Sequence, residues 1–98
     1  MKIRFLTIAQ SELDDAFDWY EKQAIGLGYN FLEALNVALR LVVSYPELQP
    51  LVSANIRRCL LNRFPYALYY RITKDEIFVV AVAHLRRKPK YWHDRVKE

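Results

Sequence analysis

The residues best suited to chemistry gather near the end of the chain, in the stretch AHLRRKPKYW at 83–92. An apolar strand-like run ends there in His84, four cations within five residues, and two aromatic side chains. Arginine forks bind phosphate and carboxylate groups, and an aromatic ring can stack on a base or anchor a partner. The alternative is that these residues have no binding role and only form the solvent-exposed end of a strand. The stretch predicts a surface for an anionic or flat target, made of Arg86, Arg87, Lys88, Lys90, Tyr91 and Trp92.

A second group of cations lies in the preceding strand-like runs: Arg57, Arg58, Arg63 and Arg71. Strand alternation places Arg57 and Arg63 on one face and Arg58 on the other. One face must pack on helices, so at least one arginine lies near an edge or pairs with an acid such as Glu47. Structural pairing and partner binding both remain open for this group.

Histidines and aromatic residues complete the candidates. His84 titrates near neutrality and is suited to acid–base work, or to a structural hydrogen bond. His84 and His93 lack a third ligand at suitable spacing, so we expect no metal site and no cofactor. Tyr66, Tyr69 and Tyr70 are expected to pack in the core or to line a groove. Trp19 lies off the apolar stripe of its helix, where it covers an edge or meets a partner.

Length and charge limit the function classes. The 98 residues suit one domain, 1–98, and the single cysteine fits a reducing cytoplasm. The N-terminus does not read as a signal peptide, and the longest apolar run, residues 77–83, is far below the about 20 residues that span a bilayer. Residues 1–50 carry four cations and seven acids, whereas residues 51–98 carry eleven cations and four acids. This asymmetry predicts a basic half that meets an anionic partner.

The positioning elements follow from hydrophobic periodicity. We predict a strand at 2–7, a helix that begins near 9–11 with Ser11 as a candidate cap, and a second helix from Phe31 to before Pro46. The glycines in IGLGYN at 25–30 separate them as a helical hairpin. Strands follow at 56–64, 66–73 and 76–84, then a short helical tail, KYWHDRVKE. The expected class is α+β, a small antiparallel sheet with the hairpin on one face, in the order β-α-α-β-β-β.

Four stretches in this order resemble the RelE/ParE superfamily of toxins from bacterial type II toxin–antitoxin systems. They are AQSELDDAFDWYE, GLGYNF, IRRCLLNRFPYALYYRI and VVAVAHLRRKPKYW, spread over nearly the whole chain. The resemblance implies a RelE-like fold, a cytoplasmic growth-inhibiting toxin and a cognate antitoxin that wraps it. We expect antitoxin contacts at Trp19, Arg57, Arg63, Tyr69 and Arg71.

The resemblance leaves the target open between two kinds of member. RelE-like members cut mRNA on the translating ribosome without a metal, and ParE-like members poison DNA gyrase. The RelE pattern places cations where this chain has Leu60 and Ala67, which favours ParE-like action without nuclease chemistry. If the chain is instead a nuclease, its candidate catalytic residues are Arg58, His84, Arg86, Tyr91 and Trp92. A non-toxic nucleic-acid or protein-binding module is the third alternative.

Overall fold

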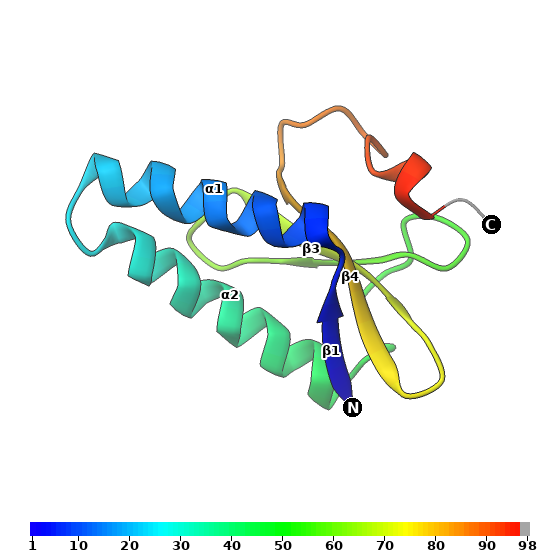
Figure 1. Cartoon of the computed structure of the whole chain (residues 1–98). Coiled ribbons are helices and arrows are strands. Elements are labelled where there is room, and N and C mark those ends of the chain that lie inside the picture. The colour runs from blue at the N-terminus through cyan, green and yellow to red at the C-terminus, as the bar shows by residue number, and fades with distance from the viewer. Residues whose placement is uncertain (97–98) are drawn as a thin grey trace.

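The computed structural model describes residues 1–96, and the last two positions of the predicted tail, 97 and 98, lie outside the described residues. Two helices lie side by side over one face of a four-stranded sheet, which confirms the α+β class (Figure 1). The elements in chain order are β1 (Lys2–Phe5), α1 (Thr7–Gln23), α2 (Leu27–Ser44), β2 (Arg57–Leu60), β3 (Tyr66–Ile72), β4 (Glu76–His84) and the 3₁₀ helix η1 (His93–Val96).

The sheet is mixed, with strand order β1-β4-β3-β2. β2, β3 and β4 are antiparallel as predicted, whereas β1 pairs in parallel with β4. The parallel strand was not predicted, because the pattern of a four-residue strand carries no sign of its direction. β1 ends at Phe5, opposite Val79, where the chain turns into α1. The second half of β4 therefore has no neighbouring strand on this side within residues 1–96.

The main core lies between the helices and the sheet, and it includes Leu13, Phe31, Leu35, Leu68 and Tyr70. A smaller cluster of Ile56, Val80, Ala81 and Trp92 lies apart from it. Strict alternation places Ala81 with Ile77 and Val79, but the register shifts between Tyr69 and Tyr70, so that Val80 is the extra residue of a β-bulge. Beyond the bulge, Val82 rather than Ala81 belongs to the main core.

The ends of several elements differ from the prediction: β1 ends at Phe5 rather than at residue 7, and α2 begins at Leu27 rather than at Phe31. α1 begins at Thr7, and its N-cap position, Leu6, makes no side-chain cap, so the prediction of Ser11 as a cap is wrong. Because α1 begins at Thr7, Glu12 lies outside the first turn of the helix. β2 stops at Leu60 rather than at residue 64, and the chain then turns through Arg63, which has a left-handed backbone with φ of 70°.

The helical hairpin closes at Gly26, whose φ of 90° suits glycine. The two carboxylate oxygens of Glu21 accept hydrogen bonds from the N–H groups of Gly26 and Gly28, each at 2.9 Å. Glu21 thus satisfies donors at the start of α2 that have no partner within the helix. Gly28 lies so near α1 that an added Cβ would be 2.8 Å from the carbonyl oxygen of Phe17.

Candidate functional site: the basic loop and its anchor

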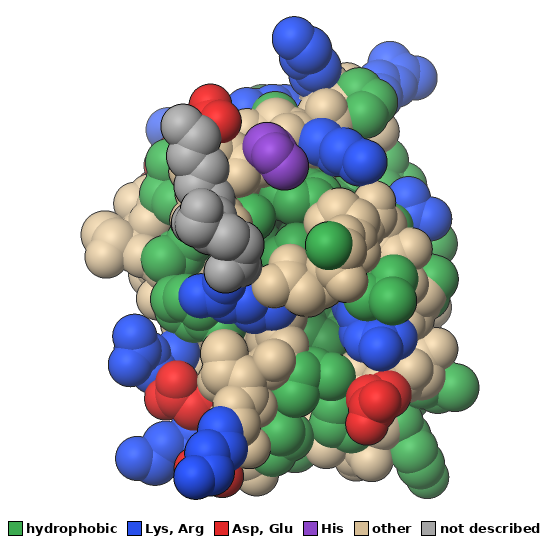
Figure 2. Space-filling view, turned by 90° about the vertical axis from the view of Figure 1, so that its right-hand side faces the viewer, with side chains coloured by type: hydrophobic (Ala, Val, Ile, Leu, Met, Phe, Trp, Pro, Cys, Tyr) green, Lys and Arg blue, Asp and Glu red, His purple; other side chains and the backbone are tan. Residues whose placement is uncertain are grey.

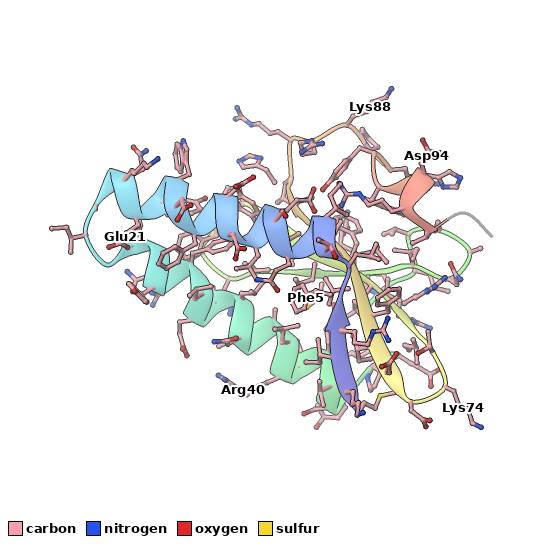
Figure 3. All side chains as sticks on the ribbon, in the orientation of Figure 1. Phe5, Glu21, Arg40, Lys74, Lys88 and Asp94 are labelled. Carbon is pink, nitrogen blue, oxygen red and sulfur yellow. The ribbon has the colours of Figure 1, made fainter. Side chains whose placement is uncertain are left out.

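The basic loop, residues 85–90, follows β4 and rises above α1 (Figure 1). All six residues are exposed, and Lys88 stands at the crest and points away from the molecule (Figure 3). Lys and Arg side chains stand out along the upper edge of the neighbouring face (Figure 2). None of the loop cations forms an ion pair with a carboxylate of residues 1–96. Four uncompensated positive charges therefore lie within five residues, at Arg86, Arg87, Lys88 and Lys90.

The loop is anchored by Glu12, a carboxylate on α1. Its Oε2 accepts hydrogen bonds from the Tyr91 hydroxyl at 2.5 Å and from Nη2 of Arg95 at 3.0 Å. Its Oε1 accepts from Nη1 of Arg95 at 2.9 Å and from the backbone N–H of Val82 at 3.0 Å. The Glu12 and Arg95 side chains are only 15% and 14% exposed, so this pair is shielded from solvent. Glu12 thereby fixes to α1 both η1, through Arg95, and the segment just before it, through Tyr91.

The anchor, formed by Glu12, Tyr91 and Arg95, also supplies hydrogen-bond partners to backbone groups on the open edge of β4. The N–H of Val82 donates to Glu12, and the carbonyl of Val80 accepts from Nη1 of Arg95 at 3.0 Å. These backbone groups lie beyond the end of β1, where a longer strand would have paired them. Buried backbone groups need partners, and here two side chains supply them.

The electrostatics of the anchor favour a charged Glu12. Burial by itself would raise the pKa of the Glu12 carboxyl, but hydrogen bonds from Arg95, Tyr91 and Val82 outweigh it and lower the pKa. Burial and the hydrogen bond to Glu12 raise the pKa of the Tyr91 hydroxyl above its ordinary value. The hydrogen bond to Glu12 raises the pKa of Arg95 as well. Tyr91 therefore stays a neutral donor beside a carboxylate that stays ionised.

Tyr91 connects the anchor to the basic loop. The Arg87 guanidinium lies 3.9 Å from the centre of the Tyr91 ring, in a cation–π contact. The Arg95 guanidinium lies 4.9 Å from the same ring. A row of contacts thus runs from α1 through Glu12 and Tyr91 to Arg87, so one loop cation is positioned by the body of the protein.

The structure corrects the placement of Trp92. We predicted a target contact, but its side chain is only 1% exposed and packs beside Tyr69, with ring centres 5.3 Å apart. Trp92 belongs to the smaller hydrophobic cluster and fixes the C-terminal segment to the sheet. Tyr91 is half-buried, and its hydroxyl is already bonded to Glu12. The exposed part of the predicted target surface is therefore the four loop cations.

The sheet arginines have separate environments. Nη1 of Arg57 donates to the carbonyls of Glu47 and Gln49 at 3.0 and 2.7 Å, so it holds the loop after α2 through the backbone rather than through the Glu47 carboxylate. Arg58 lies opposite Tyr69 on β3, on the face away from the helices. Arg63 is exposed in the turn after β2, so the predicted shared face of Arg57 and Arg63 is wrong.

Arg71 lies on β3, opposite Phe78 of β4, on the sheet face that carries no helix. Its guanidinium lies 5.3 Å from the centre of the Phe78 ring. Arg4 of β1 lies opposite Phe78 on the other side and approaches the ring to the same distance. Tyr69 is half-buried against Trp92. Arg71 and Tyr69, two of the predicted antitoxin contacts, therefore already make contacts within the chain itself.

The five candidate nuclease residues do not form one site. His84 packs its ring against Tyr66 on the helix-covered face, whereas Arg58 lies on the opposite face. Nδ1 of His84 accepts a hydrogen bond from the backbone N–H of Arg86 at 3.0 Å, so this nitrogen is already engaged within the loop. Trp92 is buried and Tyr91 belongs to the anchor. Residues that attack and stabilise one phosphate must lie around a common point, and these do not.

A groove lies between α1 and the second half of β4. It has a volume of about 610 Å³, and its lining includes the aromatic rings of Trp19, Tyr20 and Tyr66. Asp15 is on its α1 side and Arg87 is on its loop side. The groove therefore adjoins the basic loop and shares one cation with it.

Within residues 1–96, histidine, cysteine, aspartate and glutamate side chains nowhere gather in a group of three or more that suits a metal ion. Among the described helices, none has the length and apolar character needed to cross a membrane.

Sequence reasoning missed Glu12, because an acid beside Asp14 and Asp15 near the start of an amphipathic helix reads as solvated. A signal was present, because Glu12 lies three residues after the buried Ala9 and four before the buried Ala16. That spacing puts Glu12 on the side of α1 that faces the sheet. Its partners, however, are 70 to 83 residues away, and nothing local indicates them.

The fold and the basic loop are those of a small α+β protein, and comparison with known families gives its class. The sequence model described as the ParE toxin of the type II toxin–antitoxin system parDE matches residues 3–89. The match spans most of the chain, so the chain belongs to the ParE toxin family. An antitoxin partner follows from membership of such a system. No curated protein matches the sequence.

A solved structure has the same fold. It is described as the chromosomal ParDE toxin–antitoxin system from P. aeruginosa, and it matches with a TM-score of 0.62 at 21% sequence identity. The match covers 86% of this chain and 95% of that chain. At this identity the likeness concerns the fold alone. The family match stops at residue 89, so Tyr91 and Arg95 of the anchor lie beyond it, whereas Glu12 lies within it.

Proposed function

We propose that this chain inhibits bacterial growth in the cytoplasm by ParE-like action on DNA gyrase, and that the cognate antitoxin neutralises it. The observation that carries the proposal is the basic loop, with four exposed cations and no acidic partner within residues 1–96. Burying such charges against a target that lacks acidic groups would be costly, so the loop fits an anionic surface. The phosphate groups of DNA held by gyrase would be such a surface.

The nuclease alternative receives less support from the geometry. Arg58 and His84 lie on opposite faces of the sheet, and Ala67 and Leu60 stand at positions where the RelE pattern has cations. Growth inhibition without mRNA cleavage is therefore the expected outcome.

The test begins with a short pulse of expression in a bacterial host without the antitoxin. We expect growth to stop, DNA breaks to accumulate and mRNA 5′ ends to stay unchanged. Purified protein should inhibit supercoiling by purified gyrase. New mRNA ends placed in frame within codons would overturn gyrase action in favour of mRNA cleavage, and continued normal growth would overturn the toxin assignment.

Charge-reversal variants test whether the basic loop contacts the target. The double variant Arg86→Glu with Arg87→Glu should fold and lose toxicity. The double variant Lys22→Glu with Lys74→Glu makes the same change in net charge at exposed positions outside the basic loop, and it should remain toxic. Equal toxicity of the two variants would show that the basic loop does not contact the target.

A further inference from the structure

The four cations of the basic loop differ in how firmly their side chains are held. The Arg87 guanidinium lies 3.9 Å from the centre of the Tyr91 ring, and the Tyr91 hydroxyl donates a hydrogen bond to Glu12 on α1. The side chains of the other three cations make no ring contact, ion pair or hydrogen bond within residues 1–96. Arg87 is therefore the one cation of the loop whose charged group rests on the body of the protein.

Backbone turns flank Arg87 on both sides. The N–H of Arg87 donates to the carbonyl of His84 at 3.0 Å, and the N–H of Tyr91 donates to the carbonyl of Lys88 at 3.2 Å. Hydrogen bonds thus place both the backbone of Arg87 and the ring that its guanidinium contacts. A side chain that is already ordered loses less conformational entropy when it binds a ligand.

The ring contact leaves the hydrogen-bonding edge of the Arg87 guanidinium open. A separation of 3.9 Å is direct van der Waals contact, at which two planar groups pack face to face. The N–H donors of a guanidinium lie in its plane, and those of Arg87 make no hydrogen bond in the described part of the chain. Two parallel N–H groups match two oxygens of one anion. Because Arg87 is exposed, an anion reaches this edge without a rearrangement of the loop.

Glu12 positions Arg87 without neutralising it. The Glu12 carboxylate pairs with Arg95 at 2.9 Å, so its charge is compensated there. Its contact with the loop is the hydrogen bond from Tyr91, which fixes the ring. The positive charge of Arg87 therefore remains available to a ligand, while its orientation depends on a carboxylate of α1.

We propose that Arg87 is a pre-oriented bidentate contact to one phosphate of the DNA held by gyrase, and that Glu12 positions it through the Tyr91 ring. This inference rests on the proposed function, because it takes that DNA as the target surface. Four uncompensated cations within five residues match the row of like charges in a phosphodiester backbone, which an isolated carboxylate does not supply. The other three cations then contribute mainly through their charge.

The first test compares charge-conserving variants of the full chain in binding to a complex of gyrase and DNA. Arg87→Lys keeps the charge but removes the planar fork, so we expect about tenfold weaker binding. The slope of affinity against salt should not change, because the number of cations near phosphates is the same. Arg86→Lys should cost about twofold or less, since that side chain has no ring contact. Arg40→Lys, in a solvent-exposed pair on α2, is the neutral control.

Equal losses for Arg86→Lys and Arg87→Lys would overturn the pre-oriented contact. A double-mutant cycle then separates positioning from stability. Glu12→Gln should weaken binding by about fivefold in the wild-type background and by much less when Arg87 is already lysine. A role of Glu12 in stability alone would give the same loss in both backgrounds, and that result would overturn the positioning role.

An NMR measurement reports the positioning without any target. The face of an aromatic ring shields nearby protons, so the Nε–H resonance of Arg87 should lie upfield in the wild-type chain. This shielding should fall in Glu12→Gln and also in Tyr91→Phe, which keeps the ring but loses the hydroxyl that Glu12 holds. Tyr91→Phe serves alone if Glu12→Gln does not fold. Unchanged shielding in the folded variants would show that Glu12 does not position Arg87.

The ligand and the proposed function are tested separately. A linear DNA duplex without gyrase offers phosphates alone, and gyrase without DNA offers protein carboxylates alone. Tight binding to gyrase without DNA that depends on Arg87 would overturn the phosphate contact. Binding to the duplex that depends on Arg87, with no inhibition of supercoiling, would overturn gyrase action and keep the phosphate contact. Absence of wild-type binding to the complex, the duplex and gyrase would overturn both.

Discussion

The hydroxyl of Tyr91 donates a hydrogen bond to the carboxylate of Glu12 across 79 residues of sequence. This contact connects the segment after β4 to α1, and Arg95 reinforces it from η1. The anchor fixes the end of the basic loop, because Arg87 rests on the ring that Glu12 holds.

Removing the Tyr91 hydroxyl should weaken the anchor and leave the ring in place. We expect Tyr91→Phe to lower the free energy of unfolding by about 1–2 kcal/mol, because a buried charged acceptor loses one donor. Denaturant titration measures this change. Tyr29→Phe is the control, since Tyr29 is exposed and its hydroxyl makes no hydrogen bond within residues 1–96. Equal stability of the two variants would show that the Tyr91 contact contributes nothing.

The Glu12 anchor predicts a pH dependence of stability. The folded-state pKa of Glu12 lies below its ordinary value of 4.5, so the folded state favours the ionised form. The resulting stabilisation is present above the unfolded pKa and is lost as the pH falls through the lower folded pKa. Glu12→Gln should therefore be less stable than the wild-type chain at pH 6, with a smaller difference at pH 3. A difference that stays constant between these values would contradict the prediction.

Replacing either glycine of the hairpin should destabilise the protein, but for different reasons at the two positions. At Gly26 an added Cβ meets no atom within 4 Å, but the φ of 90° strains L-residues. Asparagine tolerates this conformation better than alanine, so Gly26→Asn should be the milder change. At Gly28 the obstacle is the Phe17 carbonyl at 2.8 Å, so a larger side chain should be worse and Gly28→Asn should destabilise more than Gly28→Ala. Thermal unfolding of the four variants decides the order.

Arg57 should control the order of the loop between α2 and β2. Its guanidinium bridges two carbonyls of that loop, and Arg57→Ala removes both bonds, at a cost of about 1–2 kcal/mol. We expect faster amide hydrogen exchange at residues 47–52 in this variant. Arg63→Ala, at an exposed turn, is the control and should leave the exchange of those amides as in the wild-type chain.

The sequence predicts the elements better than their contacts. The helices have strong apolar periodicity, and Leu13, Ala16 and Tyr20 of α1 are buried as their spacing predicts. Strict alternation along β4 gives the correct faces as far as Val80, because the bulge there puts Val80 and Ala81 in the same cluster and reverses the alternation beyond it. A bulge depends on the pairing with β3, and the sequence of β4 alone does not reveal it.

The candidate site was also predicted only in part, because local sequence does not reveal contacts between distant residues. The exposed cations Arg86 and Arg87 follow from local composition. Trp92 and Glu12 do not, because their environments are created by contacts with Tyr69 and with Arg95 that lie far away in the sequence. An aromatic residue in a basic stretch reads as exposed, and an acid on an amphipathic helix reads as solvated, until the fold places partners against them.

The pairing of Glu12 and Arg95 with the edge of β4 that lies beyond the end of β1 has a consequence for self-association. Unpaired strand edges are templates on which other chains add as strands, and natural proteins block them with charged side chains. Here the N–H of Val82 and the carbonyl of Val80 are already occupied, by a carboxylate and a guanidinium that no incoming strand can imitate. The same ion pair that holds the basic loop in place therefore protects the sheet from aggregation at this edge.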